Sequence, residues 1–412
     1  MSVNLRFSNS SLAVLLSSMV VSYTAEAAIN VNGDLIAEAR RLELFSVTSY
    51  GSGSGNYIAP STQEWSQFKI AAAALFTGDL TVAESNAASL DYELVIFTHT
   101  NDQRTFVALR SRETNGAPIK PWGTYFVNTN SAVNVLVGAP HPQNDLRTPQ
   151  LAADVFLKSG ARGLLIAGSH RNANGSNTAD PGNLTNTIFH AVHEAWSGID
   201  AENTQWQIHG FAPANHPEFP SNCLAVLSSG VDKTNVMSTN IVILDQHLEW
   251  NGIKSYAYND ALATNDPLNI AVNEGVPGTT FDGLAATHNV QGKYSRALGG
   301  TFVHVESATV VRTTVELRTR AVDAIAAAIL STRTNVPPLL GPLVLTPTLL
   351  PNDQFQFTTP TQRYHAYQAE NCTELSTGNW TVLYSFPGDN QPRAFTNSTA
   401  TNPSGFFRVR AD

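Results

Sequence analysis

Val133-Asn-Val-Leu-Val-Gly-Ala-Pro-His-Pro-Gln-Asn-Asp145 is an apolar run that ends in a histidine and an aspartate. The apolar residues at its start predict a buried β-strand over residues 133–137. Thr148 follows shortly afterwards and is expected to cap a helix, because Pro149 suits the first helical position. A strand followed directly by a helix indicates an α/β unit.

The same alternation continues along the chain. Further strands are predicted at residues 163–167, 204–208, 224–227 and 301–305, with helices at 184–196, at 237–250 and after the last strand. The run at 163–167 has no polar side chain, as expected when helices cover both faces of a sheet. We therefore predict an α/β fold with a mixed, mostly parallel sheet that is covered by helices.

The segment before this unit, residues 28–90, is expected to form a helical hairpin. Ser61-Thr-Gln-Glu64 and Thr81-Val-Ala-Glu84 each match a capping box, in which a hydroxyl and a carboxylate satisfy the first turn of a helix. Residues 92–97 and 105–109 then predict a pair of strands around a polar turn.

The segment after this unit begins with a proline-rich linker that runs from Pro337 to Pro351. Short alternating runs without a helical period follow and predict a small β-sandwich. The expected organisation is an N-terminal segment at residues 1–27, the hairpin region at 28–90, the α/β domain at 91–335 and the β-sandwich at 336–412.

The first residues are typical of a secretory signal. Arg6 precedes the apolar run Leu12-Ala-Val-Leu-Leu-Ser-Ser-Met-Val-Val21, which is too short for a stable membrane span. Ala25-Glu-Ala27 supplies the small residues that a signal peptidase reads. We expect cleavage after Ala27 and a secreted, periplasmic or cell-surface location. The alternative, a buried N-terminal helix, is less favoured because no amphipathic face is visible.

The composition restricts the partners of the protein. A net charge of -9 and the lack of a basic cluster argue against binding to nucleic acid. No later segment is apolar enough to be an integral membrane span, so a small molecule or a peptide is the expected partner. Cys223 and Cys372 are permitted to pair outside the cell, but Cys223 starts an apolar run, which favours a buried free thiol.

His141 is the first candidate metal ligand. The predicted strand delivers it to the carboxyl edge of the sheet, where ligands bind in open α/β folds. Asp145 lies four residues further on, and a turn there would bring both side chains to one Zn²⁺ ion. A catalytic zinc needs three such nitrogen or oxygen ligands and a water. In the alternative interpretation, Asp145 only binds loop amides near the helix start.

His209 closes the strand Gln205-Trp-Gln-Ile-His209. Strand alternation places Gln205, Gln207 and His209 on one face. Buried polar groups need partners, and a metal is one such partner. The alternative is a hydrogen-bonded structural histidine. The neighbouring Gly210 would let a substrate approach the backbone closely.

Glu306 ends the strand Phe302-Val-His-Val-Glu306 and is the candidate catalytic base. A carboxylate beside a metal-activated water can take its proton and pass it to the leaving amine. The alternative is a salt bridge to Arg312 on the following helix, and the two interpretations are compatible.

Five further residues are expected around the site. Arg171 follows the strand at 163–167 and is the candidate for binding a substrate carboxylate. Asp180 is expected to orient Arg171 or to approach the metal. His288, Asn289 and Arg296 precede the last strand and are candidates for lining the cleft.

One histidine cluster is interpreted as unrelated to the metal. His190, His193 and Glu194 share a helix face but lack the His-Glu-x-x-His order of zincins. Apolar neighbours supply the buried side of this helix, so the cluster is expected to be solvated or only partly covered. A serine hydrolase is disfavoured because the sequence has no Gly-x-Ser-x-Gly motif.

The segments that end in His141, His209 and Glu306, together with Arg171 and Asp180, resemble the N-formylglutamate amidohydrolase group. That group is related to zinc-dependent N-acetylmuramoyl-alanine amidases and carboxypeptidase-like exopeptidases. The resemblance covers about residues 133–330. It implies one zinc ion on two histidines and an acidic residue, with His141 and His209 as the histidines and Glu306 as the base. Asp145 departs from the spacing of the acidic ligand in these groups.

These observations lead to one main hypothesis and two alternatives. The main hypothesis is an exported zinc-dependent hydrolase that cleaves an amide bond in a small peptide, an N-acyl amino acid or a cell-wall peptide. The first alternative is a binding or attachment protein that retains the fold without catalysis. The second alternative is an esterase or phosphoesterase that uses the same metal.

Overall fold

The computed structural model describes residues 28–199, 204–231, 237–332, 345–351, 354–361, 366–374, 379–387, 392–398 and 406–411. The expected signal peptide at 1–27 lies outside these residues. Within the described ranges, no helix combines the length and the apolar character that crossing a bilayer would require.

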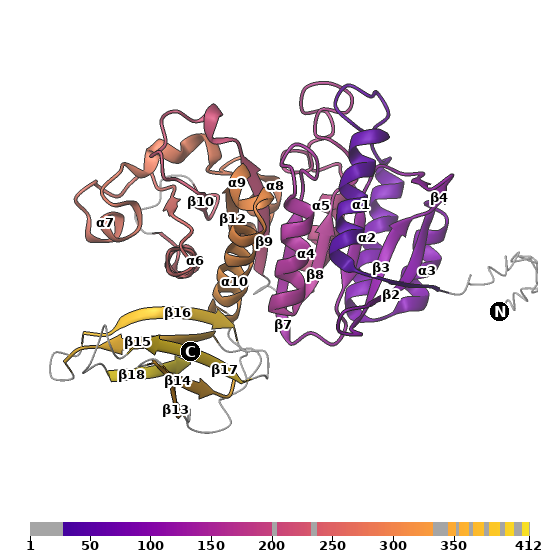
Figure 1. Ribbon diagram of the computed structural model, residues 1–412. Coiled ribbons are helices and arrows are strands. Elements are labelled where there is room, and N and C mark those ends of the chain that lie inside the picture. The colour runs from indigo at the N-terminus through magenta and orange to yellow at the C-terminus, as the bar shows by residue number, and fades with distance from the viewer. Residues whose placement is uncertain are drawn as a thin grey trace, which may run out of the picture.

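A ten-stranded sheet forms the main body and confirms the predicted α/β class (Figure 1). In spatial order its strands are β1 (Ile29–Gly33), β2 (Tyr92–His99), β3 (Thr105–Ser111), β6 (Thr124–Val127), β8 (Ala161–Ile166), β7 (Val133–Ala139), β9 (Thr204–Phe211), β12 (Thr301–Ala308), β10 (Ala225–Ser228) and β11 (Ser255–Ala257). A separate hairpin consists of β4 (Glu113–Thr114) and β5 (Ala117–Pro118).

The centre of this sheet is parallel, and antiparallel strands extend it on both sides. β8, β7, β9 and β12 all run in one direction. β10 is antiparallel to β12, and β2, β3 and β6 form antiparallel pairs next to β8. The carboxyl ends of the four central strands therefore lie at one edge of the sheet.

Helices cover both faces of the sheet, as the apolar strands require. One layer packs into a core with one face of the strands and consists of α1 (Leu35–Thr48), α4 (Thr148–Ser159), α6 (Thr239–Trp250) and α10 (Val315–Thr332). The opposite core is covered by α2 (Thr62–Thr77), α3 (Leu80–Ala88) and α5 (Ile188–Ser197). Shorter segments are α7 (Pro267–Asn273), α8 (Val290–Ala297), α9 (Thr309–Thr313) and the 3-10 turns Pro213–Asn215 and Gly278–Leu284.

The helix starts show where local sequence signals were right. The capping box of Ser61 and Glu64 forms at the start of α2 as predicted. The second capping box is wrong, because α3 begins at Leu80 and Asp79 caps it by accepting a bond from the Val82 N–H. Thr148 is the first residue of α4 rather than its cap, a position that Arg147 takes with a φ of 71°.

The helices expected as a separate hairpin share a core with the sheet. Phe68 of α2 makes an edge contact with Tyr92 of β2, with ring centroids 4.7 Å apart. α2 also packs against α5, which lies far along the chain. β1 and α1 were not predicted, and they add an edge strand and a helix to the same body.

The C-terminal residues form two small antiparallel sheets, as expected for a β-sandwich. The first contains β13 (Thr346–Leu350), β14 (Gln354–Thr359) and β17 (Arg393–Ser398), and the second β16 (Thr381–Pro387), β15 (Ala366–Cys372) and β18 (Phe406–Ala411). β16 lies against α10 and α6 of the main body. Cys223 and Cys372 are both buried free thiols, which confirms the prediction for Cys223.

Candidate metal centre

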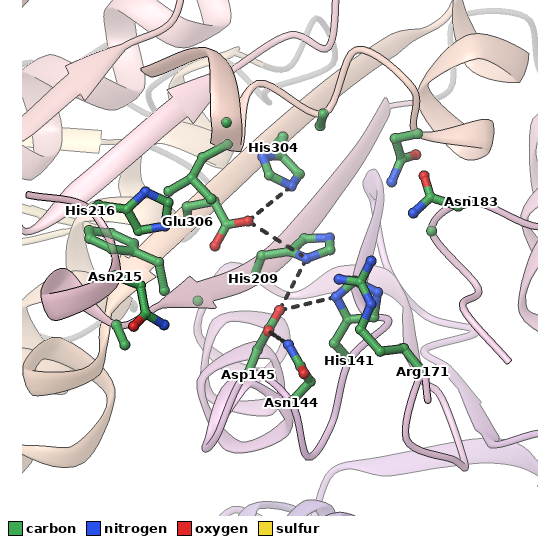
Figure 2. A pocket seen from close by; sticks show the side chains of 18 of the residues that line it. His141, Asn144, Asp145, Arg171, Asn183, His209, Asn215, His216, His304 and Glu306 are labelled. Atoms are coloured by element: carbon green, nitrogen blue, oxygen red, sulfur yellow. Dashed lines mark hydrogen bonds and ion pairs between the residues drawn. The ribbon is translucent and has the colours of Figure 1, made fainter. Parts of the chain in front are cut away.

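Three neighbouring parallel strands bring the predicted residues to one place (Figure 2). His141 lies just after β7, which ends at Ala139. His209 of β9 pairs in register with Glu306 of β12. These residues therefore meet at the carboxyl edge of the sheet, where a topology of this kind places its ligands.

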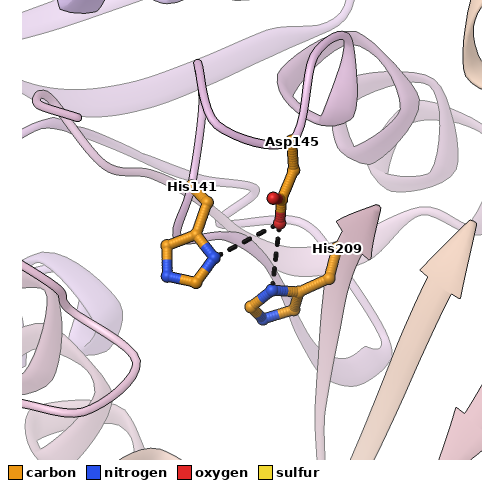
Figure 3. A group of neighbouring side chains, drawn as sticks. All are labelled: His141, Asp145 and His209. Atoms are coloured by element: carbon orange, nitrogen blue, oxygen red, sulfur yellow. Dashed lines mark hydrogen bonds and ion pairs between the residues drawn. The ribbon is translucent and has the colours of Figure 1, made fainter. Parts of the chain in front are cut away.

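His141, Asp145 and His209 form a compact group (Figure 3). Oδ2 of Asp145 lies 3.2 Å from Nδ1 of His141 and 3.2 Å from Nδ1 of His209. The two imidazole rings are nearly perpendicular, at 80°. All three side chains are buried, so their polar atoms need partners inside the protein.

The spacing of these atoms fits a shared metal ion and is longer than that of a typical charge-assisted hydrogen bond. Ligand atoms bound tetrahedrally to zinc at about 2.0–2.1 Å are roughly 3.3 Å from one another. A charge-assisted N–H···O bond is shorter, at about 2.7–2.9 Å. Two imidazole nitrogens and one carboxylate oxygen are also a donor set that zinc accepts, and such a set leaves a fourth position for water or substrate.

A second layer of side chains orients both histidines. Nε2 of His141 lies 2.9 Å from Oδ1 of Asp180, which as a carboxylate can only accept. His141 must therefore carry a proton on Nε2. Nε2 of His209 lies 3.1 Å from Oε1 of Gln207. Partners of this kind fix the ring orientation of metal-binding histidines.

Asp180 has two neighbours rather than one. Besides His141, it forms an ion pair with the guanidinium of Arg171. Its Oδ1 also accepts a 2.9 Å bond from the Gly182 N–H, which fixes the carboxylate. Asp180 thus contacts both Arg171, which it was expected to orient, and His141, a candidate metal ligand.

His141, Asp145 and His209 change one another's pKa values. Burial raises the pKa of Asp145, but the adjacent His141 and His209 outweigh burial and hold this pKa well below its usual range. For His141, burial lowers the pKa, but Asp145 and Asp180 raise it by a larger amount. The resulting pKa of His141 is about 9. Burial lowers the pKa of His209. Asp145 is therefore a carboxylate at neutral pH, as a metal ligand must be.

Glu306 lies beside this group. Its Oε1 is 4.0 Å from Nδ1 of His209, and its Oε2 is buried without a hydrogen-bond partner in the described part of the chain. Burial, with a contribution from Asp145, raises the pKa of Glu306 to about 8. A carboxyl group with such a pKa can both accept and return a proton near neutral pH.

Arg312 does not form the expected salt bridge with Glu306. Its guanidinium donates instead to the carbonyl oxygens of Leu146, Phe211 and Ser307. It also fills the space above the backbone of Gly210. A β-carbon at Gly210 would therefore meet this guanidinium, although Gly210 itself also lines the cleft over the site.

His304 is a site residue that the sequence analysis did not select. Its Nε2 lies 3.7 Å from Oε1 of Glu306, and its Nδ1 is buried without a hydrogen-bond partner among the described residues. Burial and the neighbouring His209 lower its pKa, so His304 is neutral. Strand alternation already placed His304 on the face of Glu306, and this signal could have identified it.

A cleft of about 530 Å³ opens over these side chains. Its lining is largely polar and includes Arg171, His288 and Asn289, as expected. Additional lining residues that the sequence analysis did not select are Asn144, Asn183, Asn215, His216 and Asp282. Arg296 does not line this cleft, and its guanidinium donates a 3.0 Å bond to the carbonyl of Ser229.

His190 and His193 of this cluster are buried, which corrects for them the expectation of a solvated or only partly covered face, whereas Glu194 is only partly covered. His190 and His193 are 2% and 0% exposed. His190 pairs with Glu194 at 3.1 Å, and Ser295 of α8 lies 3.1 Å from His193. Burial lowers the pKa of His190 to about 4. α8 packs over this face of α5, and local periodicity could not indicate that helix.

No family model matches this sequence, and neither does a curated protein. Among solved structures, the chain matches N-formylglutamate amidohydrolase from Ralstonia eutropha JMP134 with a TM-score of 0.31 and 11% sequence identity. The alignment covers 51% of this chain and 96% of that chain. A similarity of this size carries no weight for the site, whose interpretation rests on its geometry.

Proposed function

We propose that this protein is an exported zinc-dependent hydrolase of amide bonds, with His141, Asp145 and His209 as the metal ligands. The observation that carries the proposal is the position of one carboxylate oxygen, 3.2 Å from a nitrogen of each histidine. This spacing matches the edge of a zinc coordination polyhedron. The apolar N-terminal segment supports export.

Bound zinc would supply a Lewis acid that polarises the scissile carbonyl and lowers the pKa of water. Glu306 would accept a proton from the attacking water. It would then give this proton to the leaving nitrogen as the C–N bond breaks, yielding a carboxylic acid and an amine. His304 lies beside Glu306 as a neutral imidazole and therefore adds no charge next to this carboxyl group.

Arg171 would bind a carboxylate of the substrate. Its side chain lines the cleft and is 25% exposed, while Asp180 and Asn177 hold it in place. A fixed guanidinium can bind a carboxylate through two parallel hydrogen bonds. This arrangement favours a small peptide, an N-acyl amino acid or a cell-wall peptide as substrate.

Metal content tests the proposal most directly. Zinc is quantified by mass spectrometry in the purified wild type, in His141→Ala and in His209→Ala. His216→Ala is the matched control for metal content, because His216 lines the same cleft without contacting Asp145. We expect one zinc per chain in the wild type and the control, and loss of zinc in the two ligand variants.

A wild type that binds no stoichiometric zinc would refute the proposal. If the wild type does bind zinc, its hydrolysis of matched amide and ester substrates, each carrying a free carboxylate, is measured next. Cleavage of esters without cleavage of amides would replace the amidohydrolase with an esterase. Zinc binding without hydrolysis of either class would indicate a binding protein.

A further inference from the structure

A chain of buried hydrogen bonds runs from the backbone to His209. Gln291 of α8 donates from Nε2 to the carbonyl of Pro181 at 2.7 Å. Gln207 donates from Nε2 to Oε1 of Gln291 at 3.0 Å. Oε1 of Gln207 lies 3.1 Å from Nε2 of His209. Both glutamines are fully buried, so water does not offer them alternative partners.

The direction of this chain is fixed at its far end. The carbonyl oxygen of Pro181 can only accept, so the atom of Gln291 beside it must be the amide nitrogen. The oxygen of Gln291 then faces Gln207 and requires a donor there. Gln207 consequently presents its own oxygen to His209.

A second backbone group imposes the same orientation independently. The N–H of Gly292 can only donate, and it donates to Oδ1 of Asn289 at 2.9 Å. Nδ2 of Asn289 is thereby directed at Oε1 of Gln207, at 2.8 Å. A rotation of the Gln207 amide would set donor against donor at Asn289 and acceptor against acceptor at Gln291.

An oxygen held in this way makes His209 the donor. His209 must carry its proton on Nε2, which leaves the lone pair of Nδ1 directed at Oδ2 of Asp145, 3.2 Å away. A lone pair facing a carboxylate oxygen is unfavourable without a cation between them. We propose that Gln207, held by Gln291 and Asn289, is a positioning residue that selects the metal-binding tautomer of His209. This inference rests on the proposed zinc site.

NMR of the imidazole nitrogens tests the inference without any activity measurement. The wild-type protein is labelled with the NMR-active nitrogen isotope in histidine, and His209→Ala assigns the signals of His209. Above neutral pH we expect His209 to be protonated on Nε2, both before and after zinc is added. A metal-free wild type with the proton on Nδ1 would overturn the proposal, whatever the variants do.

The variant Gln207→Leu removes the acceptor, and Gln205→Leu is its matched control. Gln205 lies on the same face of β9 and is equally buried, but its amide atoms have no hydrogen-bond partner in the described residues. We expect Gln207→Leu to lose the Nε2–H preference and to weaken zinc binding by about 10- to 100-fold in Kd. Gln205→Leu should keep the wild-type tautomer and Kd.

The outcomes separate this inference from the proposed function. If zinc binds and Gln207→Leu behaves like Gln205→Leu in both measurements, the positioning role fails and the zinc site stands. If the wild type binds no zinc but Gln207→Leu alone shifts the tautomer, the positioning role stands and the zinc hydrolase fails.

Discussion

Oδ2 of Asp145 and Nδ1 of His209 lie 3.2 Å apart although 64 positions separate the two residues in the chain. Asp145 belongs to the loop after β7, and His209 belongs to the neighbouring strand β9. The contact therefore exists only when the parallel centre of the sheet is complete. Metal binding at this contact should report directly on the folded state.

Zinc should accordingly stabilise the protein against unfolding. A ligand at a hundred times its Kd, bound only by the folded state, adds about 2.7 kcal/mol to the free energy of unfolding. We expect this increase in denaturant titrations of the wild type after zinc is added, and its reversal by a chelator. His141→Ala should not respond to zinc, and an equal response in that variant would exclude His141 as a ligand. Magnesium should have little effect, since nitrogen ligands suit it poorly.

Replacement of Glu306 with Gln should separate chemistry from metal binding. The amide keeps the shape of the side chain but cannot accept the proton of the attacking water. We expect zinc content to be unchanged and kcat to fall by about 100- to 10,000-fold. Turnover close to wild type would remove Glu306 from the role of base, whereas loss of zinc would make it a ligand.

Arg171→Ala should act on substrates that carry a carboxylate. A hydrogen bond to a charged group contributes about 1.5–3 kcal/mol, so kcat/KM should fall roughly 10- to 100-fold for such a substrate. The same substrate with its carboxylate converted to an amide provides the control and should be cleaved equally by both proteins. An identical loss on both substrates would assign Arg171 to the support of Asp180 alone.

Asp245 should make stability depend on pH. Burial raises its pKa from 3.8 to about 7, and its Oδ1 accepts a 2.7 Å bond from Ser255. The folded state therefore holds the proton more tightly than the unfolded chain. This contribution to stability is complete below pH 3.8 and is lost as the pH rises to about 7.

The variant Asp245→Asn has no carboxyl group to ionise in this buried position, so its stability does not fall as the pH rises. Its side-chain oxygen can still accept the bond from Ser255. We expect the variant to be more stable than the wild type at pH values above about 7, by roughly 2–4 kcal/mol, and similar to it near pH 4. Urea titrations across this range measure the difference. Asp282→Asn, at an exposed carboxylate, is the control. A difference between wild type and Asp245→Asn that is constant with pH would contradict the prediction.

Gly210→Ala should be costly although the substitution is small. A β-carbon at this position would occupy the place of the Arg312 guanidinium, which is 2% exposed and cannot move into water without losing its carbonyl partners. We expect a loss of about 2–4 kcal/mol in the free energy of unfolding. Gly33→Ala in β1 is the control, because its β-carbon meets Phe97 at an ordinary 3.5 Å. Equal losses in both variants would show that Arg312 adapts.

The sequence patterns predicted which candidate side chains lie at the ends of strands. His141, His209 and Glu306 each end or follow an apolar run, and the parallel pairing of β7, β9 and β12 makes these ends neighbours. Strand alternation also indicated the face of His304, although this residue was not selected. Local patterns therefore suffice for residues whose position depends on one strand and one edge.

Contacts between distant segments could not be predicted in this way. The burial of His193 depends on Ser295, which lies on α8 about a hundred residues later. The partners of Arg312 lie in the loop after β7 and at the ends of β9 and β12, which come together only in the folded sheet. The strand pattern marks Gln207 only as a polar residue. Its proposed role depends on Gln291 and Asn289, which lie more than eighty positions later in the chain.

Arg312 also has a consequence for how this chain can vary. Two of the carbonyl oxygens that it holds, those of Phe211 and Ser307, lie at the ends of β9 and β12, and the third, that of Leu146, lies in the loop after β7. An insertion or deletion in the loop after β7 must return the carbonyl of Leu146 to the same guanidinium. Homologous proteins that keep this arginine should therefore conserve the length of this loop, while loops elsewhere on the sheet vary freely.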